Sequence, residues 1–235
     1  MSLPDVVSRE QWLAARQRLL AAEKELTRKR DALNADRRRL PMVEVIEDYV
    51  FEGESGQLSL AELFGRSRQL IVQHVMFGPD WNEPCPSCSV AISEMTPGLF
   101  DNLRSRETTF VLTSRAPYPK LAQAQAERDW DVPWYSSSGG SFNDDYGATI
   151  NRAAPQYNYR AEPELAQATE MPGFSCFLRN GNSVYHTYST YARGTEYIGN
   201  AYTLLDLTAL GRQESWEEPQ DRTQVIRVGD PSFSS

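Results

Sequence analysis

Between Gln69 and Ser93 the chain reads QLIVQHVMFGPDWNEPCPSCSVAIS. Its first nine residues, 69–77, form an apolar run of the kind found in strands that are buried on both faces. A loop at 78–84 leads to Cys85, and residues 86–105 favour a helix. The pattern therefore predicts a strand, a loop and a helix that begins at a Cys-Pro-Ser-Cys motif.

Periodic segments on both sides of this unit predict the other elements. Residues 108–113 read as a second buried strand, and Ser114 is placed to cap a helix at about 117–129. Two strands at 174–179 and 183–188 flank Asn180-Gly181, which favours a type I′ hairpin turn because both central residues need positive φ. The remaining predicted elements are an extended piece at 43–51 before a turn at 54–57, a short helix at 59–64, an extended piece at 130–136 and a closing helix at 195–207.

This order of elements is a βαβ unit followed by an antiparallel hairpin and a helix. It predicts an α/β fold of the thioredoxin-like type, with three α/β/α layers and a mixed central sheet. We expect one domain at 41–210, with a polar insertion at 137–170, and a polar C-terminal tail at 211–235. The insertion is rich in Ser, Gly, Asn and Asp, and a segment this long without clear periodicity is usually functional or mobile.

The segment 1–40 predicts a long helical arm. Ser8 and Gln11 have capping-box spacing, and no Gly or Pro follows before Pro41. Apolar residues recur every seven positions, while the companion positions are apolar only in the first half. The recurring residues are Trp12, Leu19, Leu26, Leu33 and Leu40, and the companions are Ala15, Ala22, Lys29 and Asp36. Such a narrow stripe is compatible with packing on the helix's own domain or with a homo-oligomer that forms through the arm.

Composition excludes several classes of protein. The chain has 235 residues, three Cys and a net charge of −8, with 40% hydrophobic and 24% charged residues, so wholesale disorder is excluded. The acidic balance argues against nucleic acid or an anionic membrane as a partner. The N-terminus lacks the pattern of a signal peptide, and no apolar run approaches the roughly 20 residues of a membrane span. We therefore expect a cytoplasmic protein.

The Cys pair carries the clearest chemical signal. A Cys at a helix start faces unpaired backbone N–H groups and the positive end of the helix dipole, which favour the thiolate. Pro86 suits the first helical turn, where its missing N–H is not needed. Cys88, three residues on, lies on the same helical face. We therefore expect Cys85 to attack a disulfide and Cys88 to resolve the mixed disulfide.

Two other interpretations of the pair remain open at this point. A structural zinc site wants four ligands, and the other soft ligands, Cys176, His74 and His186, are isolated in sequence. Two packed thiols without a function are the second alternative. Cys176 and His74 lie in apolar strands and are expected to be buried. His186 opens a run rich in hydroxyl groups, which could line a polar pocket or form a solvated sheet face. We expect no metal and no cofactor.

Several strings in the chain resemble a bacterial family catalogued as a domain of unknown function. The resemblance covers about residues 9–211. The strings are Trp12-Leu13-Ala14-Ala15-Arg16, Glu23-Lys24-Glu25-Leu26-Thr27, Asp48-Tyr49-Val50-Phe51, Phe77-Gly78-Pro79-Asp80-Trp81 with Cys85-Pro86-Ser87-Cys88-Ser89, Ser114-Arg115-Ala116-Pro117, Phe142-Asn143-Asp144-Asp145, and His186-Thr187-Tyr188-Ser189-Thr190-Tyr191-Ala192-Arg193-Gly194. It implies a thioredoxin-like fold related to the peroxiredoxin (alkyl hydroperoxide reductase/thiol-specific antioxidant) branch.

This resemblance leaves three functions open. They are a thiol–disulfide oxidoreductase acting on a protein or small-molecule redox substrate, a thiol peroxidase with Cys85 as the peroxidatic Cys, and an inactive thioredoxin-fold scaffold. Peroxiredoxins place a Thr three residues before that Cys, and here the residue is Asn82. Thioredoxins place a cis-proline before the strand that faces the Cys pair, at Gly173 or Pro172 here. The candidate supporting residues are Trp81, Asn82, Pro86, Ser87, Arg115 and His186.

Overall fold

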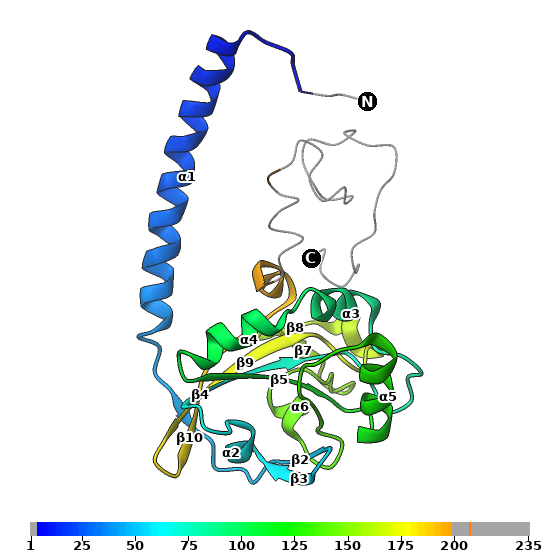
Figure 1. Cartoon of the computed structure of the whole chain (residues 1–235). Helices are drawn as coiled ribbons and strands as arrows, with labels where there is room; N and C mark the ends of the chain where they lie inside the picture. The colour runs from blue at the N-terminus through cyan, green and yellow to red at the C-terminus, as the bar shows by residue number, and fades with distance from the viewer. Residues whose placement is uncertain (1–3, 199–206, 208–235) are drawn as a thin grey trace. The chain divides into compact units, whose positions relative to one another are not determined.

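The computed structural model describes residues 4–198 and 207 (Figure 1). Within these residues the main sheet has eight strands in the order β1-β10-β9-β4-β5-β6-β2-β3. The strands are β1 (Val43–Glu44), β2 (Val50–Gly53), β3 (Gly56–Ser59), β4 (Gln69–His74), β5 (Thr108–Ser114), β6 (Trp134–Ser136), β9 (Gly173–Asn180) and β10 (Ser183–Tyr191). The centre of the sheet is therefore built from the buried strands that the sequence predicts.

The direction of these strands defines the fold. β4, β5 and β6 are parallel neighbours, whereas β9 runs antiparallel to β4 and pairs with β10 in a hairpin. Two helices, α3 (Pro86–Ser93) and α4 (Pro97–Arg104), connect β4 to β5, and α5 (Tyr118–Arg128) connects β5 to β6. A βαβ unit whose first strand also pairs with an antiparallel hairpin is the thioredoxin-like arrangement that the sequence predicts.

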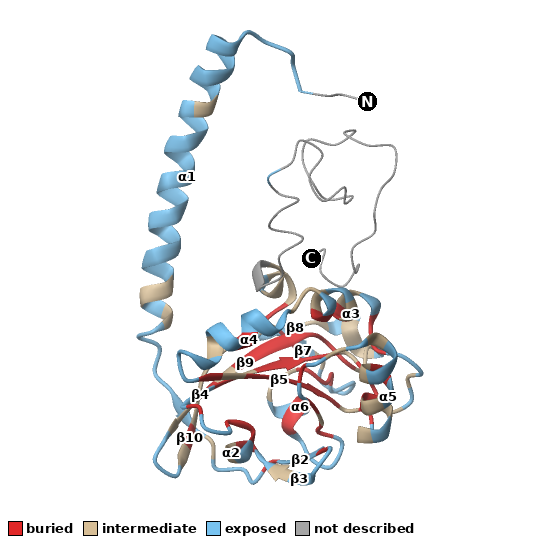
Figure 2. Cartoon of the chain, in the orientation of Figure 1, coloured by how far each residue is buried: buried red, intermediate tan, exposed pale blue. Residues whose placement is uncertain are grey.

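Side chains on the two faces of the sheet belong to separate apolar clusters. Along β4, Leu70 and Val72 point to one face, whereas Ile71 points to the other because side chains alternate along a strand. The first face packs against α2 (Leu60–Leu63) and α6 (Phe142–Asp145), and the second packs against α3, α4 and α5. Figure 2 shows the central strands buried between these layers, so the domain has the expected three-layer core.

The predicted helix at 86–105 is two helices. Pro97 is the first residue of α4, with Thr96 as its N-cap, because proline lacks the N–H that a helix interior needs. The prediction that Ser114 caps the next helix is wrong, since the N-cap residue of α5 is Pro117. The Ser114 hydroxyl instead donates to the Val75 carbonyl at 2.7 Å and accepts from the indole N–H of Trp134 at 3.0 Å.

The turn between β9 and β10 also differs from the prediction. Asn180 pairs with Ser183, so the two central residues are Gly181 and Asn182 rather than Asn180 and Gly181. Only Gly181 of these has a positive φ, at 61°. Positive φ at the first central position alone is the requirement of a type II′ turn, which glycine meets without steric strain.

Helix α1 (Arg9–Arg37) belongs to a unit separate from the sheet domain. Its capping box is present as predicted, with the Ser8 hydroxyl accepting from the Gln11 N–H at 3.2 Å. The helix ends at Arg37, so Leu40 lies beyond it. At the other end of the chain a 3₁₀ helix covers Ala192–Ile198, and the rest of the predicted closing helix, apart from Leu207, and the tail at 211–235 lie outside the described residues.

The polar insertion contains short regular elements. They are α6, a two-stranded hairpin of β7 (Gln156–Tyr157) and β8 (Arg160–Ala161), and a 3₁₀ helix at Pro163–Gln167. A small apolar cluster of Ile150, Tyr157, Met171 and Tyr191 joins the insertion to β10. In the part of the chain that the structure describes, no helix is long and apolar enough to cross a membrane.

Candidate functional site

Cys85 is the N-cap residue of α3, and Pro86 is the first residue of that helix. The backbone N–H of Cys85 donates to the carbonyl of Met76 at 2.9 Å, so the motif is fixed to the chain that continues from β4. The carbonyl of Cys85 accepts from both the backbone N–H and the hydroxyl of Ser89, each at 3.0 Å. These bonds hold the first turn of α3 in place with Cys85 at its start and Cys88 within it.

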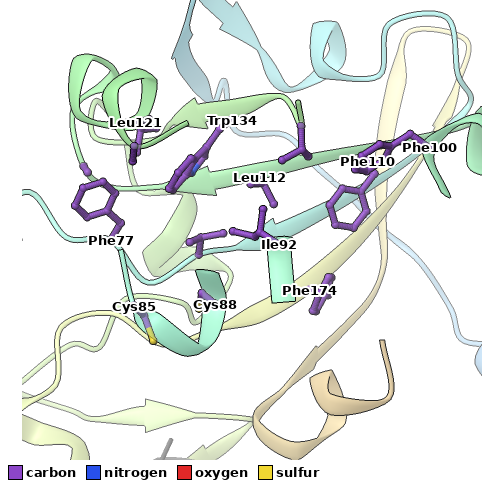
Figure 3. Close-up of a cluster of buried hydrophobic side chains, with 14 residues drawn as sticks. Phe77, Cys85, Cys88, Ile92, Phe100, Phe110, Leu112, Leu121, Trp134 and Phe174 are labelled. Carbon is purple, nitrogen blue, oxygen red and sulfur yellow. The ribbon is translucent and has the colours of Figure 1, made fainter. Parts of the chain in front are cut away.

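Both thiols are buried, with 7% of Cys85 and 6% of Cys88 exposed. They belong to the apolar cluster on the α3 face of the sheet, with Phe77, Ile92 and Phe174 around them (Figure 3). Apolar burial opposes the thiolate, whereas the helix start favours it. The two influences on the thiolate therefore oppose each other at this site, and both residues present little surface to solvent.

The loop that leads to Cys85 is held by α5. The ammonium group of Lys120 donates to the carbonyls of Pro79 and Trp81, at 2.7 and 3.0 Å. The Trp81 ring is half-buried against the apolar cluster, and Asn82, one residue later, is exposed. Within the motif Pro86 is exposed and Ser87 is half-buried. Trp81 thus packs at the site, while Asn82 lies on its outer side.

His186 lies on the opposite face of the sheet from the Cys pair. Its ring packs against Tyr146 and Phe177, at centroid distances of 5.1 and 5.6 Å, and both of these side chains belong to the α2/α6 cluster. Cys85 and Cys88 lie in the cluster on the other face. The sheet therefore separates His186 from the motif that the sequence grouped it with.

Hydrogen-bonded polar side chains, which we call the polar chain, form a row on that opposite face with His74 in its middle. His74 Nδ1 lies 3.3 Å from Asn143 Oδ1, and Nε2 lies 2.9 Å from Ser175 Oγ. Asn143 Oδ1 also accepts from the Ser137 hydroxyl at 3.1 Å. An amide oxygen only accepts, so Nδ1 carries the hydrogen and Nε2 accepts from Ser175. Burial disfavours the imidazolium and lowers the pKa of His74 to about 4.

The polar chain of hydrogen-bonded side chains continues from Ser175 on β9 to Ser189 and His186 on β10. The hydroxyls of Ser175 and Ser189 lie 2.9 Å apart, and Ser189 Oγ lies 2.8 Å from His186 Nε2. Burial lowers the pKa of His186 as well, and a hydrogen bond to the Tyr188 backbone opposes this shift. His186 therefore takes part in a network of hydrogen-bonded polar side chains on the face of the sheet that lies opposite the Cys pair.

On the other side of His74 the polar chain runs through Asn143 to Glu170 and ends at Arg115. Glu170 is 2% exposed, and its carboxylate accepts from the Thr149 hydroxyl at 3.2 Å and lies 3.5 Å from the Arg115 guanidinium. Burial raises the pKa of Glu170 to about 7, while Arg115 and a hydrogen bond from Asn143 act in the opposite direction. The anionic group that Arg115 contacts is therefore the carboxylate of Glu170.

The sequence did not single out Asn143, Glu170 or Ser175 as site residues. Asn143 stands in a string that carried the family resemblance, which was a usable signal. Glu170 stands alone in a polar segment and Ser175 in an apolar strand, so neither had a local pattern. Asn143 and Ser175 contact His74, and Glu170 contacts Asn143, only because the fold brings separate segments of the chain together.

Around the hairpin, β9 begins at Gly173, so Pro172 directly precedes the strand. The Pro172 carbonyl accepts from the Tyr157 hydroxyl at 2.6 Å. Cys176, expected to be buried, is half-buried. Among residues 4–198 and 207, no group of three or more His, Cys, Asp or Glu side chains could hold a metal ion.

Comparison with known families gives one clear match. The model of the family described as bacterial protein of unknown function, DUF899, matches residues 1–229. No curated protein matches the chain. The match covers α1, the Cys pair and the polar chain together.

Solved structures with a similar backbone include several peroxiredoxins. Peroxidoxin BcpB from Mycobacterium tuberculosis is 12% identical with a TM-score of 0.46, over 65% of this chain and 85% of that one. Peroxiredoxin Q from Xanthomonas campestris is 9% identical with a TM-score of 0.48, over 67% and 91% of the two chains. Peroxiredoxin 6 of Arenicola marina is 10% identical with a TM-score of 0.47, over 70% of each.

Proposed function

The chain belongs to the DUF899 family of bacterial proteins of unknown function, and we propose that it is a thioredoxin-like thiol–disulfide oxidoreductase that acts through Cys85 and Cys88. One observation carries this proposal: Cys85 caps the helix that follows a central parallel strand, and Cys88 lies in the first turn of the same helix. Ligands of open α/β sheets bind at this carboxyl end of the strands.

The proposed reaction has two exchanges. The thiolate of Cys85 attacks one sulfur of a substrate disulfide, so a Cys85–substrate bond forms, the substrate bond breaks and the leaving thiolate takes a proton from water. The Cys88 thiolate then attacks Cys85 Sγ and releases the second substrate thiolate. Two electrons pass to the substrate, and an external dithiol reduces the Cys85–Cys88 disulfide for the next cycle.

The burial of both thiols supports a second candidate, a thiol peroxidase. Hydrogen peroxide is much smaller than a protein disulfide and can reach the thiol of a residue that is only 7% exposed with less movement of the loop. In that reaction Cys85 is oxidised to sulfenic acid, with loss of water from the peroxide, and Cys88 condenses with it to a disulfide and releases water.

Trapping the mixed disulfide tests the first candidate. Cys88→Ser should accumulate a covalent adduct with a model disulfide substrate at Cys85, because the resolving thiol is missing. Cys85→Ser should form no adduct at the motif, and Cys176→Ser is the matched control that should turn over like the unchanged protein. Mass spectrometry of the adducts gives the readout.

Two outcomes decide between the candidates. Rapid oxidation of Cys85 by hydrogen peroxide in stopped-flow experiments, together with slow disulfide exchange, would establish the peroxidase in place of the oxidoreductase. Reaction with both oxidants no faster than that of a simple free thiol would overturn both and leave a scaffold. Either result is read against the Cys85→Ser variant.

A further inference from the structure

A stripe of large apolar side chains runs along α1. Trp12, Leu19, Leu26 and Leu33 are between 47 and 58% exposed, and no described side chain of the helix is buried. Four exposed large apolar residues in one row are unusual on the surface of a monomeric protein. We infer that α1 pairs with α1 of a second copy of the chain, parallel and in register, over residues 12–30.

The spacing of the stripe fits a short coiled coil. Taking Trp12, Leu19 and Leu26 as one core row, the companion core row contains Ala15 and Ala22. Both rows are apolar over these heptads, and the small alanines let two helices approach closely. Lys29 and Asp36 then enter the companion row, which limits the contact to the first part of the helix. About 19 residues at 1.5 Å each correspond to roughly 28 Å of contact.

Charges beside the core identify a second copy as the occupant. In a parallel in-register pair, the residue directly before a member of the Trp12 row, such as the residue before Leu19 or Leu26, lies beside the partner helix. There it faces the residue whose number is five higher than its own. Arg18 then faces the partner's Glu23, and Glu25 faces the partner's Arg30. Each contact occurs twice by symmetry, and all four join opposite charges. Self-complementarity of this kind is what a two-fold symmetric interface requires.

Ion pairs within the helix keep some of these side chains beside the stripe. Arg16 and Glu23 are joined at 2.9 Å, and Glu25 and Lys29 at 2.8 Å. A contact of two to three heptads is short, so the dimer should be reversible and dissociate on dilution. Pairing would also stabilise α1, none of whose side chains is buried among the residues that the structure describes, since most helical stability in proteins comes from packing.

Sedimentation of the full-length protein across a dilution series tests the inference. The unchanged chain should move from dimer to monomer on dilution, and Leu19→Asp should shift that midpoint at least tenfold towards higher concentration. Leu20→Asp is the matched control: Leu20 is the next residue, also apolar and 39% exposed, but it points away from the core rows. Circular dichroism of both variants checks that the helix remains.

Cross-linking tests the direction and register. In the inferred pair residue 22 faces its own copy, so Ala22→Cys should form an intermolecular disulfide on mild oxidation. Gln17→Cys, on the outer side of the helix, should not. A monomer at all concentrations would overturn the inference, as would equal effects of the two leucine variants. A dimer in which Ala22→Cys cross-links no better than Gln17→Cys would overturn the parallel register.

Discussion

At the scale of single residues, Gly173 shows how closely β9 and β10 pack at the start of the hairpin. A Cβ atom on Gly173 would lie 2.6 Å from Cδ1 of Tyr191. The Tyr191 ring is buried, and its hydroxyl donates to the Tyr146 carbonyl at 2.6 Å. The ring therefore has little room to move, and glycine is required here by close approach rather than by backbone conformation.

Gly173→Ala should lower the free energy of unfolding by about 1–3 kcal/mol, the usual effect of forcing an extra carbon into a packed core. The matched control is Gly139→Ala, where no atom lies within 4 Å of the added carbon, and its effect should stay within about 0.5 kcal/mol. Urea unfolding of both variants gives the comparison. Equal midpoints would contradict the packing argument.

At the scale of elements, α5 positions the loop that leads to the Cys motif. The Lys120 ammonium group binds two loop carbonyls, of Pro79 and Trp81. Hydrogen bonds from a charged donor are stronger than neutral ones, and loss of the donor leaves both carbonyls without it. The loop at 78–84 thus depends on a helix more than thirty residues further along the chain.

Lys120→Met should loosen this loop and so increase the rate at which Cys85 is alkylated at neutral pH. Cys85 directly follows the loop and is only 7% exposed, so a looser loop should give the alkylating reagent better access to its thiol. We also expect a loss of about 1–3 kcal/mol in the free energy of unfolding. Lys24→Met, on α1, is the control that should leave Cys85 unaffected. Mass spectrometry of the alkylated peptide measures the rate, and an unchanged rate would rule out a role of Lys120 in holding the loop.

At the scale of the whole molecule, the polar chain links stability to pH through His74. The pKa of His74 falls from 6.5 to about 4 in the folded protein. The stability that this shift contributes is present above pH 6.5 and is lost as the pH falls towards 4, because the unfolded chain takes up the proton more readily. The difference amounts to about 3 kcal/mol.

Glu170, whose pKa is raised, contributes in the opposite direction over much of this window, so the contribution of His74 is seen in the difference between the variant and the unchanged protein. His74→Asn should gain about 3 kcal/mol of stability relative to the unchanged protein as the pH falls from 6.5 to 4, whatever its effect at neutral pH. Urea titrations at half-unit steps across this window give the slope. The same slope in the variant and in the unchanged protein would show that His74 makes no contribution to the pH dependence.

Glu170 acts in the opposite direction. Its pKa rises from 4.5 to about 7, so the stability linked to its protonated form is present below pH 4.5 and is lost as the pH rises to 7. Glu170→Gln should remove this loss, which amounts to about 3 kcal/mol. The variant should gain stability relative to the unchanged protein between pH 4.5 and 7, as measured by thermal unfolding at each pH. A constant difference across the window would contradict the assignment.

Local patterns in the sequence were enough to predict the sheet centre and the Cys motif. The buried strands at 69–77 and 108–113 are apolar runs, and the motif between them needs only its spacing and its place at a helix start. The predicted starts and ends of helices were wrong at two places. Ser114 could cap a helix by pattern, but its hydroxyl is bonded within the sheet, and Pro97 divided a helix that otherwise had apolar periodicity.

Which residues share a face was decided by the tertiary structure. The sequence grouped Arg115 and His186 with the Cys pair, whereas they lie at the two ends of the polar chain that contains Glu170 and Asn143. Strand register determines the face of every side chain, and a one-residue irregularity reverses it. β10 has such an irregularity between His186 and Tyr188. His186 and Ser189 are three residues apart and would point to opposite faces of a regular strand, but the extra residue, Thr187, brings them to the same face. The pairing of β10 with β9 decides where that extra residue lies, and the local sequence does not.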